Sequence, residues 1–140
     1  MAKPISASLV LCESVLIEKT GIVSAIRILT SVNIPLSVNS IRFYALTFLT
    51  SPPHDTELHV LRTLMIEERA DGWNAIATAP DQTFHYGYAV DQHGPGGFYL
   101  STEFTIDVTK LATSGIFFVQ AWLDGERVAQ TPITLRPERD

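Results

Sequence analysis

Cysteine and charge are the two features that this sequence has least of. Its 140 residues include a single cysteine, Cys12, which excludes an intrachain disulfide and therefore a disulfide-stabilised scaffold. Only 18% of the residues are charged, whereas roughly a quarter is usual in soluble domains. Lys and Arg number 10 against 15 Asp and Glu. We therefore expect neither nucleic acid nor an acidic membrane as a partner, because both require clustered positive charge.

Hydrophobic segments long enough to cross a membrane are also missing. The apolar stretch 9–17 is interrupted by Glu13 and is shorter than the roughly 20 residues that a spanning helix needs. The first residues show no hydrophobic region of a secretory signal, so we expect a soluble, cytoplasmic protein. Glu13 is expected at an edge or interface, paired with Arg27 or Arg42. Cys12 is expected to be a buried thiol.

Motifs of the common enzyme classes are absent from the sequence. Gly94, Gly96 and Gly97 cluster, but no Gly-Lys-Ser/Thr follows them, so a phosphate-binding loop is not indicated. There is no G-x-S-x-G elbow, HExxH zinc motif or EF-hand loop. Ser, His and Asp residues are present, but no local context selects a catalytic set. We expect no enzymatic activity and no cofactor.

What the sequence does have is a series of short β-type segments separated by turn residues. The segment 98–108 alternates most regularly, with apolar even positions and polar odd ones, which is typical of a half-buried antiparallel strand. Asp124-Gly125 predicts a hairpin turn of the primed type. The sequence predicts an all-β fold, a single antiparallel β-sandwich of immunoglobulin-like or jelly-roll type with eight or nine strands. It spans residues 1–140 and ends in a polar tail, 136–140. The expected strands are 9–18, 22–29, 41–50, 57–67, 73–78, 83–90, 98–108, 115–123 and 127–135.

Histidines and loop carboxylates are the candidate metal ligands of the sequence. His85, Asp91 and His93 form the best local group, because two histidines and a carboxylate can hold a transition metal as a facial triad. Surface histidines explain the same pattern. Asp71 and Asp124 lie in predicted turns, and turn chemistry accounts for both without calcium.

Aromatic residues are the other candidates for binding. Trp73, Tyr86 and Tyr88 would form a platform on which a sugar or small molecule stacks, if their rings face solvent. Aromatic residues that alternate as Tyr86 and Tyr88 do are more often core residues.

Two predicted strands are apolar on both faces. In 41–50 and in 115–123 the apolar residues occupy odd and even positions alike, so a second cover is needed over the face that normally meets water. A long loop such as 31–40 or another protein chain would supply it. We therefore predict self-association or a protein partner, with an interface on Phe48, Phe118 and Trp122.

Both ends of the sequence carry short motifs. The opening has Leu9-Val10-Leu11-Cys12-Glu13, then Gly21, Ile26 and Pro35. The ending has an aromatic strand from Phe117 to Leu123, then Asp124-Gly125-Glu126 and Thr131-Pro132. In these motifs the chain resembles a bacterial family of short β-sandwich proteins with no assigned activity. The resemblance covers most of the chain and implies a β-sandwich fold. It implies no functional residues, because the family has none assigned.

The function that the sequence favours is a non-catalytic structural or protein-interaction module. The alternative is a small-molecule or carbohydrate-binding module that uses Trp73, Tyr86, Tyr88 and the loop 92–97. A metal-assisted hydrolase around His85, Asp91 and His93 is the third possibility. Fold alone does not decide among these classes.

Overall fold

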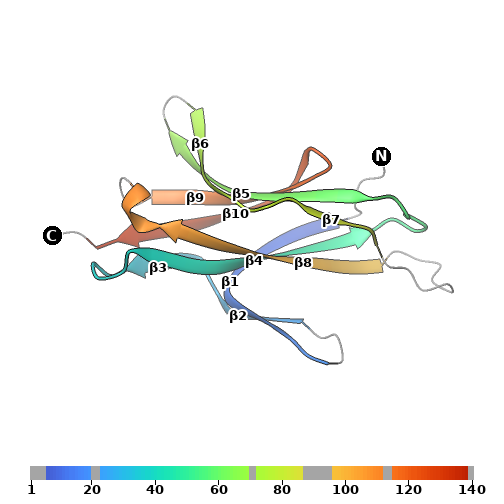
Figure 1. The fold of residues 1–140 in the computed structure, drawn as a ribbon, viewed down its shortest axis with the longest axis horizontal. Coiled ribbons are helices and arrows are strands. Elements are labelled where there is room, and N and C mark those ends of the chain that lie inside the picture. The colour runs from blue at the N-terminus through green and yellow to red at the C-terminus, as the bar shows by residue number, and fades with distance from the viewer. Residues whose placement is uncertain (1–5, 20–22, 70–71, 87–95, 112–114, 139–140) are drawn as a thin grey trace.

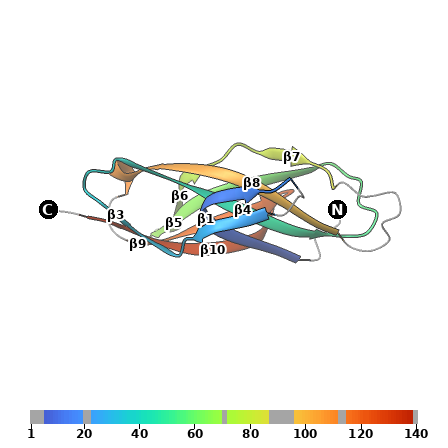
Figure 2. The same ribbon diagram turned by 90° about the horizontal axis from the view of Figure 1, so that it is seen from below.

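The protein is described by a computed structural model that covers residues 6–19, 23–69, 72–86, 96–111 and 115–138. These residues form ten strands and one short 3-10 helix, and most of the strands run along the long axis of an elongated molecule (Figures 1 and 2). The elements are β1 Ser6–Ile17, β2 Val23–Ile28, β3 Ser31–Ile34, β4 Ser40–Ser51, β5 His59–Arg69, β6 Gly72–Thr78, β7 Gln82–Phe84, β8 Gly96–Asp107, η1 Val108–Lys110, β9 Gly115–Leu123 and β10 Glu126–Pro137.

The strands form two packed sheets, which confirms the predicted all-β sandwich. The four-stranded sheet has the order β2-β1-β4-β8, and the six-stranded sheet has the order β3-β10-β9-β5-β6 with β7 also paired to β5. Every pair is antiparallel except β3 with β10, which is parallel. The strand count exceeds the predicted eight or nine, because β3 lies in the segment expected as a loop. Strand β10 also runs to Pro137, into the expected polar tail.

The core lies between the two sheets and follows the alternation of the strands. On β4 the odd residues Phe43, Ala45 and Leu49 are buried, and on the neighbouring strand β8 the even residues Phe104 and Ile106 lie beside them on the same inner face. The Phe43 and Phe104 rings stack with centroids 5.5 Å apart. Burial of these side chains is the main stabilising contribution to the sandwich. Among the described residues, none forms a helix with the length and hydrophobicity needed to span a bilayer.

The outer face of the four-stranded sheet also contains buried apolar side chains. Cys12 and Leu46 are fully buried, although their strand neighbours Leu11 and Ala45 are the ones that face the core. Burial raises the pKa of the Cys12 thiol above its usual value of 9.0. The expected buried thiol is confirmed, and it is a poor nucleophile because little thiolate forms.

Strand β2 forms one edge of the four-stranded sheet. Within it Arg27 has a φ of 56°, while Cys12 stays opposite Ile28 and Ser14 stays opposite Ile26. The Arg27 guanidinium lies 3.3 Å from the Glu13 carboxylate, which confirms one of the two predicted pairings. Both side chains are mostly exposed, so the pair contributes little to stability.

One buried hydroxyl provides a test of the core packing. Thr47 is fully buried between Ala45 and Leu49, and its Oγ1 has no hydrogen-bond partner among the described residues. We expect Thr47→Val to raise the free energy of unfolding by about 1 kcal/mol, because valine has nearly the same shape without an unsatisfied polar group. Urea unfolding measures the difference. Thr131→Val is the matched control, since the Thr131 hydroxyl donates to the Leu9 carbonyl at 2.7 Å and its loss should destabilise the protein.

Candidate functional site

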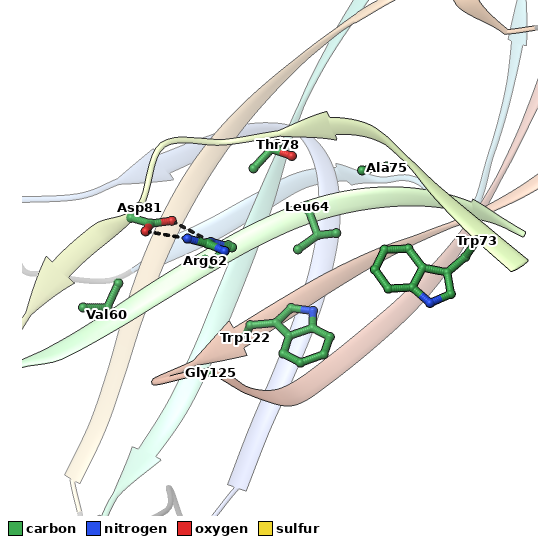
Figure 3. A pocket seen from close by; sticks show the side chains of 9 residues that line it. All are labelled: Val60, Arg62, Leu64, Trp73, Ala75, Thr78, Asp81, Trp122 and Gly125. Carbon is green, nitrogen blue, oxygen red and sulfur yellow. Dashed lines mark hydrogen bonds and ion pairs between the residues drawn. The ribbon is translucent and has the colours of Figure 1, made fainter.

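A groove on the outer face of the six-stranded sheet is the candidate functional site. It encloses about 530 Å³ and contains both tryptophans of the chain. Figure 3 shows Trp73 at one end, the Arg62–Asp81 pair at the other, and Trp122 and Leu64 between them. We call it the tryptophan groove. Its lining residues are Val60, Arg62, Leu64, Trp73, Ala75, Thr78, Asp81, Trp122 and Gly125.

The β5–β6 hairpin places Trp73 in the groove. A register irregularity between Met65 and Ile66 interrupts the β5–β6 ladder, and the end of the hairpin bends away from the rest of the sheet (Figure 1). Bulges of this kind re-aim side chains and increase local twist. Trp73 is 60% exposed, so its indole forms a wall of the groove that no other described element covers.

A chain of side-chain hydrogen bonds fixes the opposite indole. The Trp122 Nε1–H donates to Gln120 Oε1 at 3.0 Å, and Gln120 Nε2 donates to Gln130 Oε1 at 2.7 Å. Arg127 Nη1 also donates to Gln130 Oε1, at 3.2 Å. Because Gln120 is buried, Trp122 has a defined orientation. Its polar atom is engaged by the protein, and its half-buried ring lines the groove.

The polar end of the groove is a two-point ion pair. Arg62 donates from Nε to Asp81 Oδ1 at 3.0 Å and from Nη2 to Asp81 Oδ2 at 3.1 Å. The hydrogen bond and charge of Arg62 hold the pKa of Asp81 below its usual 3.8, so the carboxylate is ionised at neutral pH. The two side chains remain 58% and 42% exposed. Each therefore keeps hydrogen-bonding capacity toward solvent or a ligand.

A shallower depression continues the groove past Trp122. It encloses about 580 Å³ and is lined by Trp122, Gly125, Glu126 and Arg127. Trp122 and Gly125 line both hollows, so the Trp122 side chain separates two adjoining regions of one surface. Glu126 and Arg127 give the second region one acidic and one basic residue.

Next to the groove a fully buried histidine is held between two carboxylates. His59 Nδ1 lies 2.6 Å from Asp124 Oδ2, and His59 Nε2 lies 3.0 and 2.9 Å from the two Asp55 oxygens. The second Asp124 oxygen accepts from the Val60 amide at 2.9 Å, and the Asp124 amide donates to the Val60 carbonyl at 2.9 Å. This network, which we call the His59 clamp, holds the β9–β10 turn against the start of β5.

The charge state of the clamp follows from its geometry. Burial by itself lowers the pKa of His59, but the hydrogen bonds and charges of Asp124 and Asp55 outweigh it and raise the pKa above its usual 6.5. Each ring nitrogen faces a carboxylate, and only the protonated ring can donate from both. The clamp is therefore an imidazolium between two carboxylates near neutral pH. Asp124 and Gly125 have φ values of 51° and 85°, as the predicted primed turn requires.

Asp55, Glu57 and His59 also form the one metal-compatible group among the described residues. Their carboxylate and imidazole ligand atoms all lie within 4.8 Å of one another. However, His59 Nε2 already bonds Asp55, and the Glu57 amide donates to Asp55 Oδ1 at 2.9 Å. A cation would have to displace the hydrogen bond between Asp55 and His59. The ion pair of these two residues explains their proximity without a metal.

The predicted binding aromatics separate in the structure. Trp73 lines the groove, but Tyr86 is only 5% exposed and packs against His59, Phe84 and Phe98. A platform that includes Tyr86 is therefore wrong, because its ring closes the end of the core instead of facing solvent. Tyr88 lies outside the described residues, as does most of the loop 92–97.

The predicted metal and interface residues are placed as follows. His85 is exposed, whereas Asp91 and His93 lie outside the described residues, so the metal hypothesis stays a prediction. Phe48 is 37% exposed on the outer face of the four-stranded sheet. Phe118 and Trp122 are on β9 of the other sheet, on the face opposite the buried Phe117 and Val119. A single partner surface cannot cover all three, because they lie on opposite sides of the sandwich.

Comparisons with known proteins reveal the fold and no family. No protein-family model and no curated protein matches the sequence. An adhesin from Mobiluncus mulieris, with intramolecular disulfide, isopeptide and ester cross-links, matches over 95% of this chain and 58% of its own, with 12% identity and a TM-score of 0.54. The DNA-bound alkylpurine DNA glycosylase AlkC from Pseudomonas fluorescens matches over 94% of this chain and 30% of its own, with 12% identity and a TM-score of 0.52. The chain thus spans a little over half of the adhesin and about a third of the glycosylase.

Proposed function

We propose that the domain is a non-catalytic recognition module that binds its ligand in the tryptophan groove. The observation that carries this proposal is that the only two tryptophans of the chain, from strands far apart in the sequence, line the same hollow. Binding pockets typically combine apolar and aromatic walls with a few placed polar groups. Tryptophan is also enriched among the residues that contribute most to binding.

A non-catalytic role is supported by the groups that the groove offers. Among the described residues that line it, Asp81 is the only carboxylate, and it is engaged by Arg62. General acid–base chemistry usually uses two titratable groups whose environments separate their pKa values. The imidazole of His59 is fully buried and held on both sides, so it is not accessible to a substrate. A recognition role is also compatible with the similarity to an adhesin.

Intrinsic fluorescence tests the proposal directly, because every tryptophan of the chain reports on the groove. We expect a saturable change in emission with at least one of four probes, namely maltotriose, a decaproline peptide, inorganic phosphate and choline. Trp73→Ala should weaken the binding about tenfold or more, and the emission of the remaining Trp122 still measures it. Phe48→Ala, an aromatic truncation on the opposite outer face, is the control and should bind like the wild type. If no neutral sugar, proline-rich peptide, phosphate or quaternary ammonium probe changes the emission of the folded protein, the proposed function is wrong.

A further inference from the structure

We infer that the tryptophan groove binds a neutral glycan, with one pyranose ring packed against the indoles of Trp73 and Trp122. The inference rests on the proposed function and specifies its ligand. Three properties of the groove carry it: the two indoles that line it, the hydrogen-bonding capacity left on the Arg62–Asp81 pair, and the balanced charge of that pair.

The indoles contribute apolar ring surface to the groove more than hydrogen-bond donors. Trp122 Nε1 donates to Gln120, so this residue contributes its ring face to a ligand, and Trp73 presents a largely exposed ring across the groove. The face of an indole is the negative part of its quadrupole. One side of a pyranose ring presents several C–H groups with partial positive charge in a nearly flat array, which matches such a face in shape and in sign.

The polar end of the groove matches neighbouring hydroxyls. Arg62 uses Nε and Nη2 for Asp81, which leaves its remaining N–H groups as donors, while each Asp81 oxygen keeps a free lone pair. Donors and acceptors thus lie side by side next to the apolar floor of Val60 and Leu64. A sugar hydroxyl can both donate and accept a hydrogen bond. Two adjacent hydroxyls can therefore accept from Arg62 and donate to Asp81 at the same time. The Thr78 hydroxyl adds a further group of the same kind.

The balanced charge of the Arg62–Asp81 pair favours a neutral ligand over an ionic one. Arg62 and Asp81 carry opposite charges and neutralise each other across two hydrogen bonds. A phosphate would meet the Asp81 carboxylate, and a quaternary ammonium would meet the Arg62 guanidinium, so each would add a like-charge contact. A neutral polyol meets neither penalty.

A proline-rich peptide is the closest competitor, because aromatic grooves also bind proline rings. Proline has no N–H, so such a segment would leave the Asp81 oxygens without donors after their water is displaced. Unsatisfied polar groups are costly when they are desolvated. The Arg62–Asp81 pair therefore favours the sugar.

The adjoining depression indicates more than one sugar ring. It begins at Trp122 and Gly125 and continues to Glu126 and Arg127, again with one acid and one base. A glycan chain seated between the indoles can extend over Trp122 into this second region. We therefore expect affinity to rise from a methyl glucoside to a trisaccharide.

Titration with neutral trisaccharides tests the inference. The probes are maltotriose, cellotriose, mannotriose, galactotriose and triacetylchitotriose, read by tryptophan emission and by calorimetry. We expect at least one to bind, with a Kd that changes less than about twofold between roughly 50 and 500 mM salt, because no net charge is involved. Trp73→Ala should weaken that trisaccharide about tenfold or more, and Trp73→Tyr should restore most of the loss.

Asp81→Asn provides the polar test. It keeps the shape of the side chain but leaves Arg62 without a counter-charge, so trisaccharide binding should weaken while inorganic phosphate binding should strengthen. Phe48→Ala should leave both unchanged. If none of the five trisaccharides binds and decaproline, phosphate or choline does, the glycan inference is overturned while the recognition function stands. If no probe of any class binds, both fail.

Discussion

Replacing His59 by alanine is expected to lower the free energy of unfolding by about 3–5 kcal/mol. The imidazole is fully buried between Asp55 and Asp124, whose side chains are 2% and 13% exposed. Its removal leaves two carboxylates near each other without their shared cation, and loss of one member of a buried charge pair typically has this cost. It also opens a cavity beside Phe84 and Tyr86, whose rings contact the imidazole.

Urea unfolding of His59→Ala, compared with the wild type, measures the effect. His85→Ala is the matched control, because it removes an exposed histidine and should change stability by less than about 0.5 kcal/mol. If His59→Ala does not fold, Asp124→Asn keeps the size of the side chain and weakens the same clamp. A loss below about 1 kcal/mol in the folded variants would contradict the role given to the clamp.

The second large effect is a dependence of stability on pH above neutrality. The pKa of His59 is raised in the folded protein above its usual 6.5, so the folded state holds a proton that the unfolded state releases. The stabilisation by the imidazolium is complete below about pH 6.5 and is lost as the pH rises through the folded pKa. Within that window the free energy of unfolding falls by up to about 1.4 kcal/mol per pH unit.

Unfolding curves measured between pH 6 and pH 9 test this expectation, and His59→Gln should remove most of the slope. Imidazole NMR signals give an independent measure, because the pKa of the His59 ring should lie above its usual 6.5. Stability that rises over this range, or a His59 ring that titrates at or below pH 6.5, would show that the clamp is not an imidazolium at neutral pH.

Most of the fold could be predicted because the strands obey simple alternation. The β8 segment places Phe104 and Ile106 inward and Glu103 outward, as its two-residue period requires. Strand β3 could not be predicted in this way. Its residues are followed by turn formers such as Pro35, and its ladder partner is the distant strand β10, with Val32 opposite Leu135. Parallel pairing with a strand so far along the chain leaves no local signal.

The candidate site was predicted only in part. The sequence pointed to Trp73 as a binding residue and to Trp122 as an interface residue, but only the three-dimensional structure places both in one groove. The clamp has no local sequence signal, because His59 lies between the apolar Leu58 and Val60 and alternation would turn those two neighbours toward the core. The structure instead turns the odd residues His59 and Leu61 inward. Asp124, whose sequence context is fully explained by a turn, reaches His59 only through the β5–β9 pairing.

The positive φ of Arg27 has a consequence for how the domain behaves at high concentration. An edge strand presents a row of backbone donors and acceptors that can template pairing with a second chain, and apolar edges are the most hazardous. Strand β2 carries the exposed Ile26 and Ile28 on such an edge. The left-handed conformation of the residue between them interrupts that row, and its charge projects beside it. The backbone at Arg27 therefore disfavours pairing of this edge with a second chain. It does so between Ile26 and Ile28, whose exposed apolar side chains would otherwise favour such pairing.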